Sequence, residues 1–473
     1  MSAVRTVEKK RAEAPATEGL SQRTILRFFS PLALSWIFMS VEGPLSVALI
    51  SRLPNAEIST AAFQIMMGLA LWIESPIIDL LSTSTTLAKT RQNYVQLSRF
   101  TWWLIATVTL VHAIIAFTPA YWFVTRNLMG VPGAVAEQGR IGLAAMVPWA
   151  GLIGWRRYLQ GILIRNGRTK LIGLGTAVRV ATMFVSAFTL YWTVRLPSIE
   201  IAGIALVCAV GAEAGFAHWA SRGTIREQFS EPLFEDSPIE PGQGRALSLS
   251  RTNHRDSERG EVSVAKLCRF HLPLTATTMV MMAGSPVVSS ALSHAPNRVA
   301  QLAGYQVAAT LVWLMRTTVF ALPEVVITLY KDKASAAALR RFCIRLGFIT
   351  SGTMAAIWLT GVDELFFSKV LTAPASLIPI AHLAFIACLM LPFVGACQSY
   401  VRGMLTAHHL TVSRLLAVSV SMTTLVTTLV AAHFLGFEGV VAVGICPTLA
   451  LIAELGVLVY AWRVRPVVAA GLP

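Results

Sequence analysis

The sequence predicts an all-α membrane protein in which twelve transmembrane helices form two six-helix bundles. Three observations support this fold class. The chain of 473 residues is 55% hydrophobic and only 13% charged, with a mean hydropathy of +0.63, whereas soluble domains carry roughly 25% charged residues. Its apolar residues fall into long runs, as helices that cross a bilayer require. Finally, residues 27–100 recur without a gap as residues 269–342.

The repeat is defined by matched residues whose numbers differ by 242. The matches include Pro44 and Pro286, Pro54 and Pro296, Gln64 and Gln306, Lys89 and Lys331, and Arg99 and Arg341. The same offset relates residues 158–161 to residues 400–403, in the fourth span of each half. Since each unit contains an even number of spans, the repeat is parallel and its axis runs along the membrane normal.

The apolar runs give twelve expected spans. They are residues 28–51, 59–81, 101–124, 141–164, 171–194 and 199–219, then 267–292, 300–329, 342–361, 377–404, 413–435 and 439–462. The loops after the second, fourth and eighth spans are basic, and the alternate loops are not. Because cytoplasmic loops carry the excess of Lys and Arg, both termini are expected in the cytoplasm.

Composition divides the chain into five parts. Residues 1–24 are polar and are expected to form a disordered cytosolic N-terminus, followed by the first six-helix bundle at residues 25–220. Residues 221–266 are rich in Pro, Gly, Ser and charge, so we expect a mostly disordered cytosolic linker there. The second bundle occupies residues 267–463, and residues 464–473 form a short tail.

Charge and motifs exclude several classes of function. The net charge of +15 would suit nucleic acid, but the basic residues lie in alternate loops, where membrane topology explains them. The six cysteines lie mostly in apolar runs and lack the spacing of a zinc site or a redox motif. The sequence contains no nucleotide-binding loop or metalloprotease motif. We therefore expect a protein that is not an enzyme and binds no nucleic acid, metal or cofactor.

Charged residues inside the spans are the candidate functional residues. Each costs about 2.5–3.5 kcal/mol on insertion scales, so it normally faces a bundle interior or water. Glu42 lies beside Gly43 and Pro44, where proline bends the helix and favours a cavity-lining position. Its counterpart in the repeat is Gly284. Glu42 is predicted to couple to H⁺ or Na⁺ or to act as a gate; the alternative is a buried pair with a neighbouring arginine.

Glu74 corresponds to Arg316 in the repeat, so the two residues confront each other if both face the space between the bundles. They would then form a static pair or leave Arg316 to bind an anion, since guanidinium is a natural ligand for carboxylate and phosphate oxygens. Asp79 and Glu324 each follow a proline in corresponding regions of the second and eighth spans. Together with Glu42, these three acids are the predicted coupling or gating residues.

Arginines within the spans suggest a basic cavity. Arg156 and Arg157 differ by about 100° around a helix, so at most one of them points into a cavity. The other is expected to reach the cytosolic interface. Arg179 lies midway along the fifth span, and Arg402 corresponds to Gln160 in the repeat. The predicted substrate-binding residues are Arg156, Arg157, Arg179, Arg316 and Arg402.

Two acidic residues are predicted to be structural. Glu213 and Glu454 occupy matched Ala-Glu-x-Gly positions in the two halves. Because both copies keep a carboxylate among small residues, each glutamate is expected to hold its own bundle together.

Several short stretches together carry a resemblance to known proteins. They are Pro31-Leu32 followed by Glu42, Ser75-Pro76-Ile77-Ile78-Asp79, Gly161-Ile162-Leu163, Val401-Arg402-Gly403-Met404-Leu405-Thr406 and the region of Glu454. In this order they resemble the progressive ankylosis (ANKH) family of the MATE/MOP flippase superfamily, although Ser75 stands where that family has glycine. The two parallel six-span repeats, the bent first and seventh helices and the long central linker also resemble that superfamily.

The resemblance implies a MATE-like secondary transporter that works by alternating access, with the first, second, seventh and eighth spans lining the cleft. The progressive ankylosis family is associated with export of pyrophosphate, ATP and citrate, which implies anion export and makes Arg402 the leading candidate for anion contact. The alternatives are an H⁺- or Na⁺-coupled cation or drug antiporter and a lipid-linked oligosaccharide flippase. The expected partners are the lipid bilayer, a small anion and a coupling H⁺ or Na⁺. The expected state is a monomer in the plasma (cytoplasmic or inner) membrane.

Overall fold

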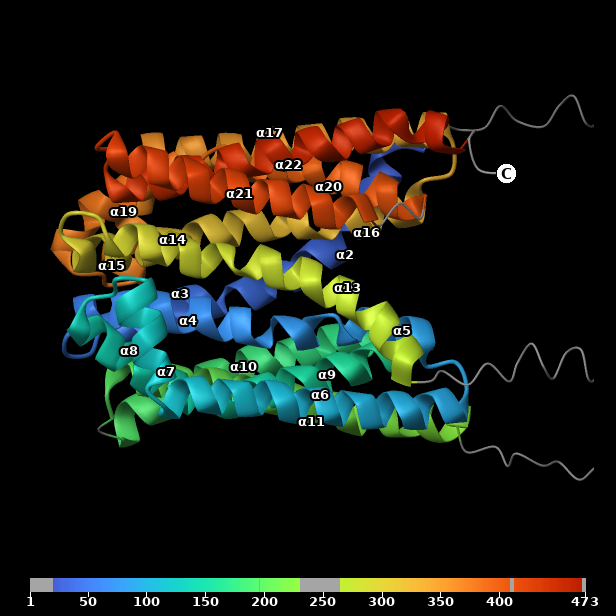
Figure 1. The fold of residues 1–473 in the computed structure, drawn as a ribbon, viewed down its shortest axis with the longest axis horizontal. Coiled ribbons are helices and arrows are strands. Elements are labelled where there is room, and N and C mark those ends of the chain that lie inside the picture. The colour runs from blue at the N-terminus through green and yellow to red at the C-terminus, as the bar shows by residue number, and fades with distance from the viewer. Residues whose placement is uncertain (1–19, 195, 230–263, 409–411, 470–473) are drawn as a thin grey trace, which may run out of the picture.

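The computed structural model describes residues 20–194, 196–229, 264–408 and 412–469. Every regular element within these ranges is a helix. Figure 1 shows two bundles that lie side by side, with most of the first half of the chain (blue to green) in one and the second half (yellow to red) in the other. Most of the predicted linker, residues 230–263, lies outside the described residues, as do residues 1–19 of the predicted N-terminal segment.

In the part of the first half that the structure describes, there are ten α-helices and one π-helical segment. They are α2 (Gln22–Ser40), α3 (Glu42–Ser51), α4 (Ala56–Ile78), α5 (Leu80–Leu87), α6 (Arg91–Phe117), α7 (Ala120–Trp122), η1 (Phe123–Leu128), α8 (Gly133–Ala145), α9 (Val147–Arg165), α10 (Thr169–Thr193) and α11 (Ser198–Phe229). We call their packed ensemble, without α2, the first bundle. Its second transmembrane span breaks at Asp79, three residues after Pro76, so that α4 and α5 meet at a bend.

The second half repeats this arrangement. Its elements are α13 (Val264–Met282), α14 (Gly284–Ser293), α15 (Arg298–Arg316), η2 (Thr317–Ala321), α16 (Leu322–Leu329), α17 (Lys333–Leu359), α18 (Val362–Leu365), η3 (Phe366–Val370), η4 (Ala375–Leu377), α19 (Ile378–Ala387), α20 (Leu391–Ala407), α21 (Val412–Phe434) and α22 (Gly439–Ala469). We call this ensemble, without α13, the second bundle. The bend between α13 and α14 at Ala283 matches the bend between α2 and α3 at Val41.

Eleven helices of the described residues are long and apolar enough to cross a membrane, and the chain is a multi-pass membrane protein. The predicted span at residues 141–164 is the one of the twelve that does not reach this threshold. It is divided at Met146 between α8 and α9, and Arg156 and Arg157 lower the hydropathy in the middle of α9.

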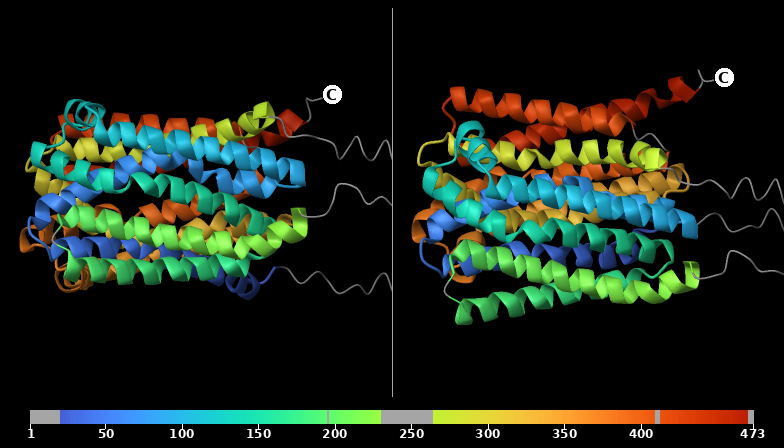
Figure 2. Two further views of the ribbon diagram at one scale, coloured as in Figure 1. Left: turned by 90° about the horizontal axis from the view of Figure 1, so that it is seen from below. Right: turned by 60° about the horizontal axis from the view of Figure 1, so that its bottom comes forward.

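The two halves enter and leave the membrane region at the same end. In Figures 1 and 2 the beginning of α2, the end of α11, the beginning of α13 and the end of α22 all lie at the end that carries the C-terminus. We call it the tail end. This arrangement is the one expected when each half crosses the membrane an even number of times.

The repeat extends to individual atoms. The Tyr158 hydroxyl lies 3.5 Å from the carbonyl oxygen of Tyr94, and the Tyr400 hydroxyl donates to the carbonyl oxygen of the equivalent Ala336 at 3.2 Å. One turn further along, Gly161 lets α9 approach α5 closely, and its counterpart Gly403 lets α20 approach α16 in the same way. A Cβ atom on Gly161 would lie 2.7 Å from the carbonyl oxygen of Leu81, so the absence of a side chain sets the distance between α5 and α9.

The first half of each hinged helix crosses to the opposite bundle. Phe29 of α2 makes an edge contact with Phe342 of α17, with ring centroids 5.4 Å apart. In the equivalent contact, His271 of α13 packs edge-on against Phe100 of α6, also at 5.4 Å. Ile25, Phe29 and Ala33 are buried in a core cluster with residues of α16 and α17. The sequence predicted bent first and seventh helices; the structure shows that their tail-end halves connect the two bundles.

The close packing at Gly161 leads to a testable prediction. Gly161→Ala places a methyl group 1.8 Å from Ser84 Oγ and 2.7 Å from a backbone oxygen, so we expect a loss of about 1–3 kcal/mol of stability from overpacking. The measurement is the thermal unfolding midpoint of the purified protein in lipid nanodiscs. The control is Gly173→Ala on α10, where a Cβ meets no atom within 4 Å, and it should leave the midpoint unchanged or slightly raise it. Equal midpoints for the two variants would refute this account of the packing.

Candidate functional site

The interior of the first bundle contains a polar cluster centred on Glu213 of α11. Arg156 of α9 donates from Nη1 to Glu213 Oε2 at 2.6 Å, and Gln160, one turn further along α9, donates from Nε2 to Oε1 at 3.1 Å. Arg179 of α10 approaches the same carboxylate, with Nη1 3.4 Å from Oε2. Glu213 is 1% exposed, so a single buried carboxylate ties α9, α10 and α11 together.

Arg179 also binds Glu42, the acid at the hinge of the first span. Its Nε donates to Oε1 of Glu42, and its Nη2 donates to Oε2 at 2.5 Å. Both side chains are less than 10% exposed. A bidentate guanidinium–carboxylate pair is among the strongest polar contacts in proteins. Because Glu42 is the first residue of α3, directly after the bend at Val41, this pair fixes α3 to the first bundle while α2 leaves it.

Glu74 and Arg157 lie beside this cluster without a close partner. Glu74 of α4 is 3% exposed, and its Oε2 accepts no hydrogen bond from the described residues. It interacts electrostatically with Arg156, Arg157 and Arg179. Nε of Arg157 is likewise buried and unpaired. Within the first bundle, three guanidiniums are therefore balanced by the carboxylates of Glu42, Glu74 and Glu213.

The second bundle has a different charge balance. Arg402 of α20 binds Glu454 of α22 through Nη2 and through Nε, the latter at 3.1 Å from Oε1. Arg316, at the end of α15, and Arg414, near the start of α21, each interact electrostatically with this pair. Neither makes an ion pair with an acid of the described residues, and Nε of Arg316 is buried without a hydrogen-bond partner. Three guanidiniums thus interact with one carboxylate of their own bundle, that of Glu454, and Arg414 also interacts with Asp79 of the first bundle.

Two acids face the opposite bundle. Asp79, at the bend between α4 and α5, accepts a hydrogen bond from Thr278 of α13 at 2.7 Å and interacts electrostatically with Arg414 of the second bundle. Glu324 of α16 is exposed, yet it interacts electrostatically with Arg157 of the first bundle. Both acids therefore lie along the boundary between the bundles. His271 of α13 reinforces this boundary, because its ring nitrogens lie 2.9 Å from the Thr83 hydroxyl and 2.8 Å from the Pro76 carbonyl oxygen.

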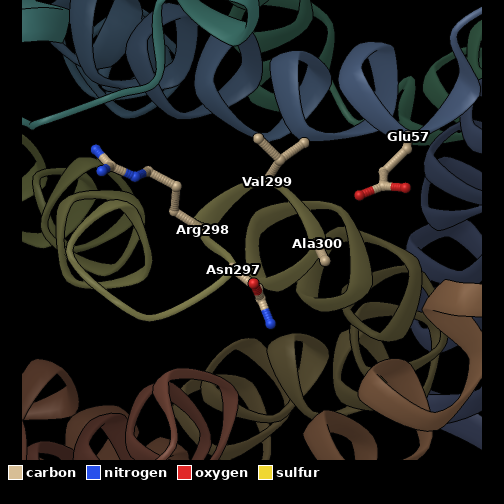
Figure 3. A pocket seen from close by; sticks show the side chains of 5 residues that line it. All are labelled: Glu57, Asn297, Arg298, Val299 and Ala300. Carbon is tan, nitrogen blue, oxygen red and sulfur yellow. The ribbon is translucent and has the colours of Figure 1, made fainter.

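A cavity of about 460 Å³ opens where α4 and α15 begin, at the end opposite the tail end. It is lined by Glu57 of α4 and by residues 297–300 at the start of α15. Figure 3 shows that Glu57 and Arg298 do not point toward each other, and Val299 lies between them. None of the site residues predicted from the sequence lines this cavity, so we do not place the candidate site there.

The predicted residues are distributed over three places. Arg156, Arg179 and Glu42 join the cluster around Glu213, with Arg157 and Glu74 beside it. Arg316 and Arg402 belong to the cluster around Glu454. Asp79 and Glu324 lie at the boundary between the bundles. The expected confrontation of Glu74 with Arg316 is not an ion pair in this structure, because each residue interacts with charges of its own bundle.

Solved structures with the same arrangement of helices are known. The chain superposes on an inward-facing multidrug-resistance MATE transporter of the MOP superfamily with a TM-score of 0.62 and 14% identity, covering 98% of this chain and 99% of the other. The chain has the MATE-like fold. The lipid II flippase MurJ in an inward closed conformation gives a TM-score of 0.66 at 13% identity, covering 92% of this chain and 88% of that one.

A third structure with the MATE-like fold is described by the polarity of its binding pocket. It is a MOP-superfamily transporter from Pyrococcus furiosus whose pocket is reported as reversed in polarity, with a TM-score of 0.59, 15% identity, and coverage of 93% of this chain and 95% of the other. At these identities the likeness shows the shared fold. No protein-family model matches the chain, and no curated protein matches its sequence.

Three polar residues in or near these clusters, Gln160, Gln398 and Arg414, were not predicted from the sequence. Gln160 and Gln398 were not candidates, because an uncharged amide in an apolar helix gives little signal. For Gln398 the repeat does give a signal, because its counterpart in the first half is Arg156. Arg414 lies two residues after the start of α21, where a basic residue is ordinarily explained as an interfacial anchor.

The Glu42–Arg179 pair gives a second prediction. Arg179→Gln leaves the Glu42 carboxylate buried without its cation, and breaking a buried pair in this way costs about 3–5 kcal/mol. The double variant Glu42→Gln/Arg179→Gln removes both charges and should recover much of that loss. The measurement is the thermal unfolding midpoint of wild type and of both variants in lipid nanodiscs. If the double variant is no more stable than Arg179→Gln, the two side chains are not coupled as described.

Proposed function

We propose that the protein is a secondary transporter that moves small anions bearing carboxylate or phosphate groups across a membrane by alternating access. The observation that carries this proposal is the charge balance of the cluster in the second bundle, where Arg316, Arg402 and Arg414 interact with one carboxylate of that bundle, Glu454, and Arg316 makes no ion pair with an acid of the described residues. An excess of buried positive charge at membrane depth is unfavourable. A substrate that carries negative charge would relieve it.

The chemistry of guanidinium favours an oxyanion as the substrate. Its planar array of donors matches carboxylate and phosphate oxygens and can bind two of them at once. Arg316 has no acidic partner among the described residues and keeps an unpaired buried Nε, so we assign it as the principal substrate contact. Arg402 shares its charge with Glu454 and has a secondary role. The resemblance to the progressive ankylosis family supports small polyanions, such as pyrophosphate, ATP and citrate, and export as the direction.

The first bundle would supply the coupling. We assign Glu74 as the site of H⁺ or Na⁺ binding, because one of its oxygens is buried and unpaired. Asp79 and Glu324 would act as gating charges, because they lie at the boundary and face Arg414 and Arg157 of the opposite bundles. Arg156 and Arg179 are neutralised within their own bundle. We propose a plasma-membrane location with both termini in the cytoplasm, and a monomer.

A cation or drug antiporter driven by H⁺ or Na⁺ is the second candidate. It is favoured by one observation, the buried and unpaired carboxylate oxygen of Glu74. A flippase for lipid-linked oligosaccharides is compatible with the MATE-like fold, but we find no feature of the described residues that selects a lipid. These alternatives are separated by the substrate that the purified protein moves.

The substrate proposal predicts the effect of removing Arg316. In proteoliposomes loaded with radiolabelled citrate or pyrophosphate, wild type should catalyse efflux, and Arg316→Gln should lower the rate about tenfold or more, because a charge-assisted contact contributes about 1.5–3 kcal/mol. The matched control is Arg298→Gln, an exposed arginine at the other end of α15, which should transport at the wild-type rate. Transport of cationic dyes but of no anion by wild type would refute the proposal in favour of the antiporter.

The coupling assignment predicts the effect of neutralising Glu74. Glu74→Gln should abolish the response of substrate efflux to an imposed pH or Na⁺ gradient, while exchange of labelled for unlabelled substrate continues, because the substrate contacts lie in the other bundle. Glu57→Gln, at the other end of the same helix, serves as the control and should keep the gradient response. A gradient response that survives in Glu74→Gln would exclude Glu74 as the coupling residue.

A further inference from the structure

The polar clusters of the two bundles are related by the repeat, yet they differ in how their hydrogen bonds are satisfied. Glu454 corresponds to Glu213, and Arg402 corresponds to Gln160. Gln398, one turn earlier on α20, corresponds to Arg156. The order of the two residues is therefore opposite in the two halves: arginine precedes glutamine on α9, and glutamine precedes arginine on α20.

In the first bundle both members of this set bind the central carboxylate. Arg156 donates to one oxygen of Glu213 and Gln160 donates to the other. In the second bundle Arg402 binds Glu454, but Gln398 does not. Its Nε2 is buried and has no hydrogen-bond partner among the described residues, and Gln398 is only 4% exposed. A buried amide donor without a partner is unfavourable, so this nitrogen is available to a bound ligand.

The surroundings of Gln398 indicate what kind of ligand this is. Gln398 and Arg402 are four residues apart and therefore lie on the same face of α20. The adjacent Ser399 donates to the carbonyl oxygen of Val319, which lies three residues after Arg316. Arg316 in turn interacts electrostatically with Arg402 and Glu454. At this level α20 thus packs against the segment that follows Arg316, and Gln398 lies on the face of α20 that carries Arg402.

The repeat also shows that acids are missing here. In the first bundle, carboxylates occupy positions 42, 74 and 213, whereas the equivalent positions of the second bundle carry Gly284, Arg316 and Glu454. Two of the three acids have therefore been replaced, one by glycine and one by a cation. At these three positions the second bundle therefore has one carboxylate where the first bundle has three.

We propose that Gln398 and Arg316 form an oxyanion subsite in the second bundle, in which the Gln398 amide and the Arg316 guanidinium donate to carboxylate or phosphate oxygens of the transported substrate. This inference rests on the proposed function and adds to it a named subsite and a residue that selects for oxyanions. The substrate oxygens supply the acceptors that Glu42 and Glu74 supply in the first bundle.

The test is ligand-induced stabilisation of the purified protein in nanodiscs, with citrate and pyrophosphate as probes. A ligand that binds the folded state raises the unfolding midpoint according to its concentration and affinity. Wild type should be stabilised by at least one of the two. Gln398→Met keeps the side-chain volume but removes the donor, and we expect the dissociation constant to rise about tenfold to a hundredfold. Arg316→Met should have at least the same effect.

The controls separate a subsite from a structural role. Gln96→Met changes a glutamine of α6, which also has an unpaired amide atom, and it should bind the anion as wild type does. In proteoliposomes, Gln398→Met should raise KM for the anion more than it lowers the maximal rate. Substitution of a residue that serves helix packing alone would not raise KM selectively. Gln398→Asn, a shorter donor, should bind more tightly than Gln398→Met.

Failure of the proposed function and failure of the subsite would give different results. If neither probe stabilises or is transported by wild type, the proposed function fails and the subsite fails with it. If wild type and Gln398→Met bind and transport the anion with equal affinity while Arg316→Met does not, the proposed function stands and the subsite is wrong. Weaker binding by Gln398→Met that is matched by Gln96→Met would likewise overturn it.

Discussion

The bidentate pair between Glu42 and Arg179 is the contact on which the arrangement of the first half depends. A guanidinium and a carboxylate buried among apolar helices are tolerated only when each satisfies the other. Here the pair is joined through Arg179 to Glu213 and so to Arg156, which makes α3, α9, α10 and α11 a single polar unit. Because the pair forms at the bend, α3 stays with its bundle while α2 crosses to the other.

Duplication produced two similar scaffolds, and substitution gave them different chemistry. The residues that set helix packing are the same in both halves, as the Tyr158 and Tyr400 bonds and the close approaches at Gly161 and Gly403 show. The charges differ. In the buried cluster of the first bundle, Arg156, Arg157 and Arg179 lie among three carboxylates, whereas the cluster of the second bundle holds one carboxylate of its own, that of Glu454. In the second bundle the hinge residue is Gly284 and no ion pair of this kind fixes it, so the two hinged helices are held by different forces.

The sequence was sufficient for the architecture and insufficient for the pairing of charges. The repeat and the apolar runs predict the bundles, their order and the bent first and seventh helices, because helix length and periodicity are local properties. Which way Arg179 faces depends on the rotation of α10 against its neighbours, which no single helix specifies. The same holds for Arg402, which pairs with Glu454; its role as an anion contact stays a prediction. The repeat relates Gln398 to Arg156, but only the structure shows that its amide nitrogen is buried without a partner among the described residues.

At the tail end, α2 and α13 join the two bundles through apolar packing and through polar contacts that are each modest in strength. They include the hydrogen bond from Thr278 to Asp79, the two contacts of His271 and the edge-on aromatic pairs of Phe29 and His271. Neutral hydrogen bonds contribute about 0.5–1.5 kcal/mol each, bonds to charged groups about 1.5–3 kcal/mol, and aromatic pairs about 0.5–1.5 kcal/mol. Each of these contacts is therefore of the size that differential binding of one ligand can supply. A ligand that binds more tightly to one arrangement of the bundles than to the other shifts the equilibrium between them by the difference in its binding free energies.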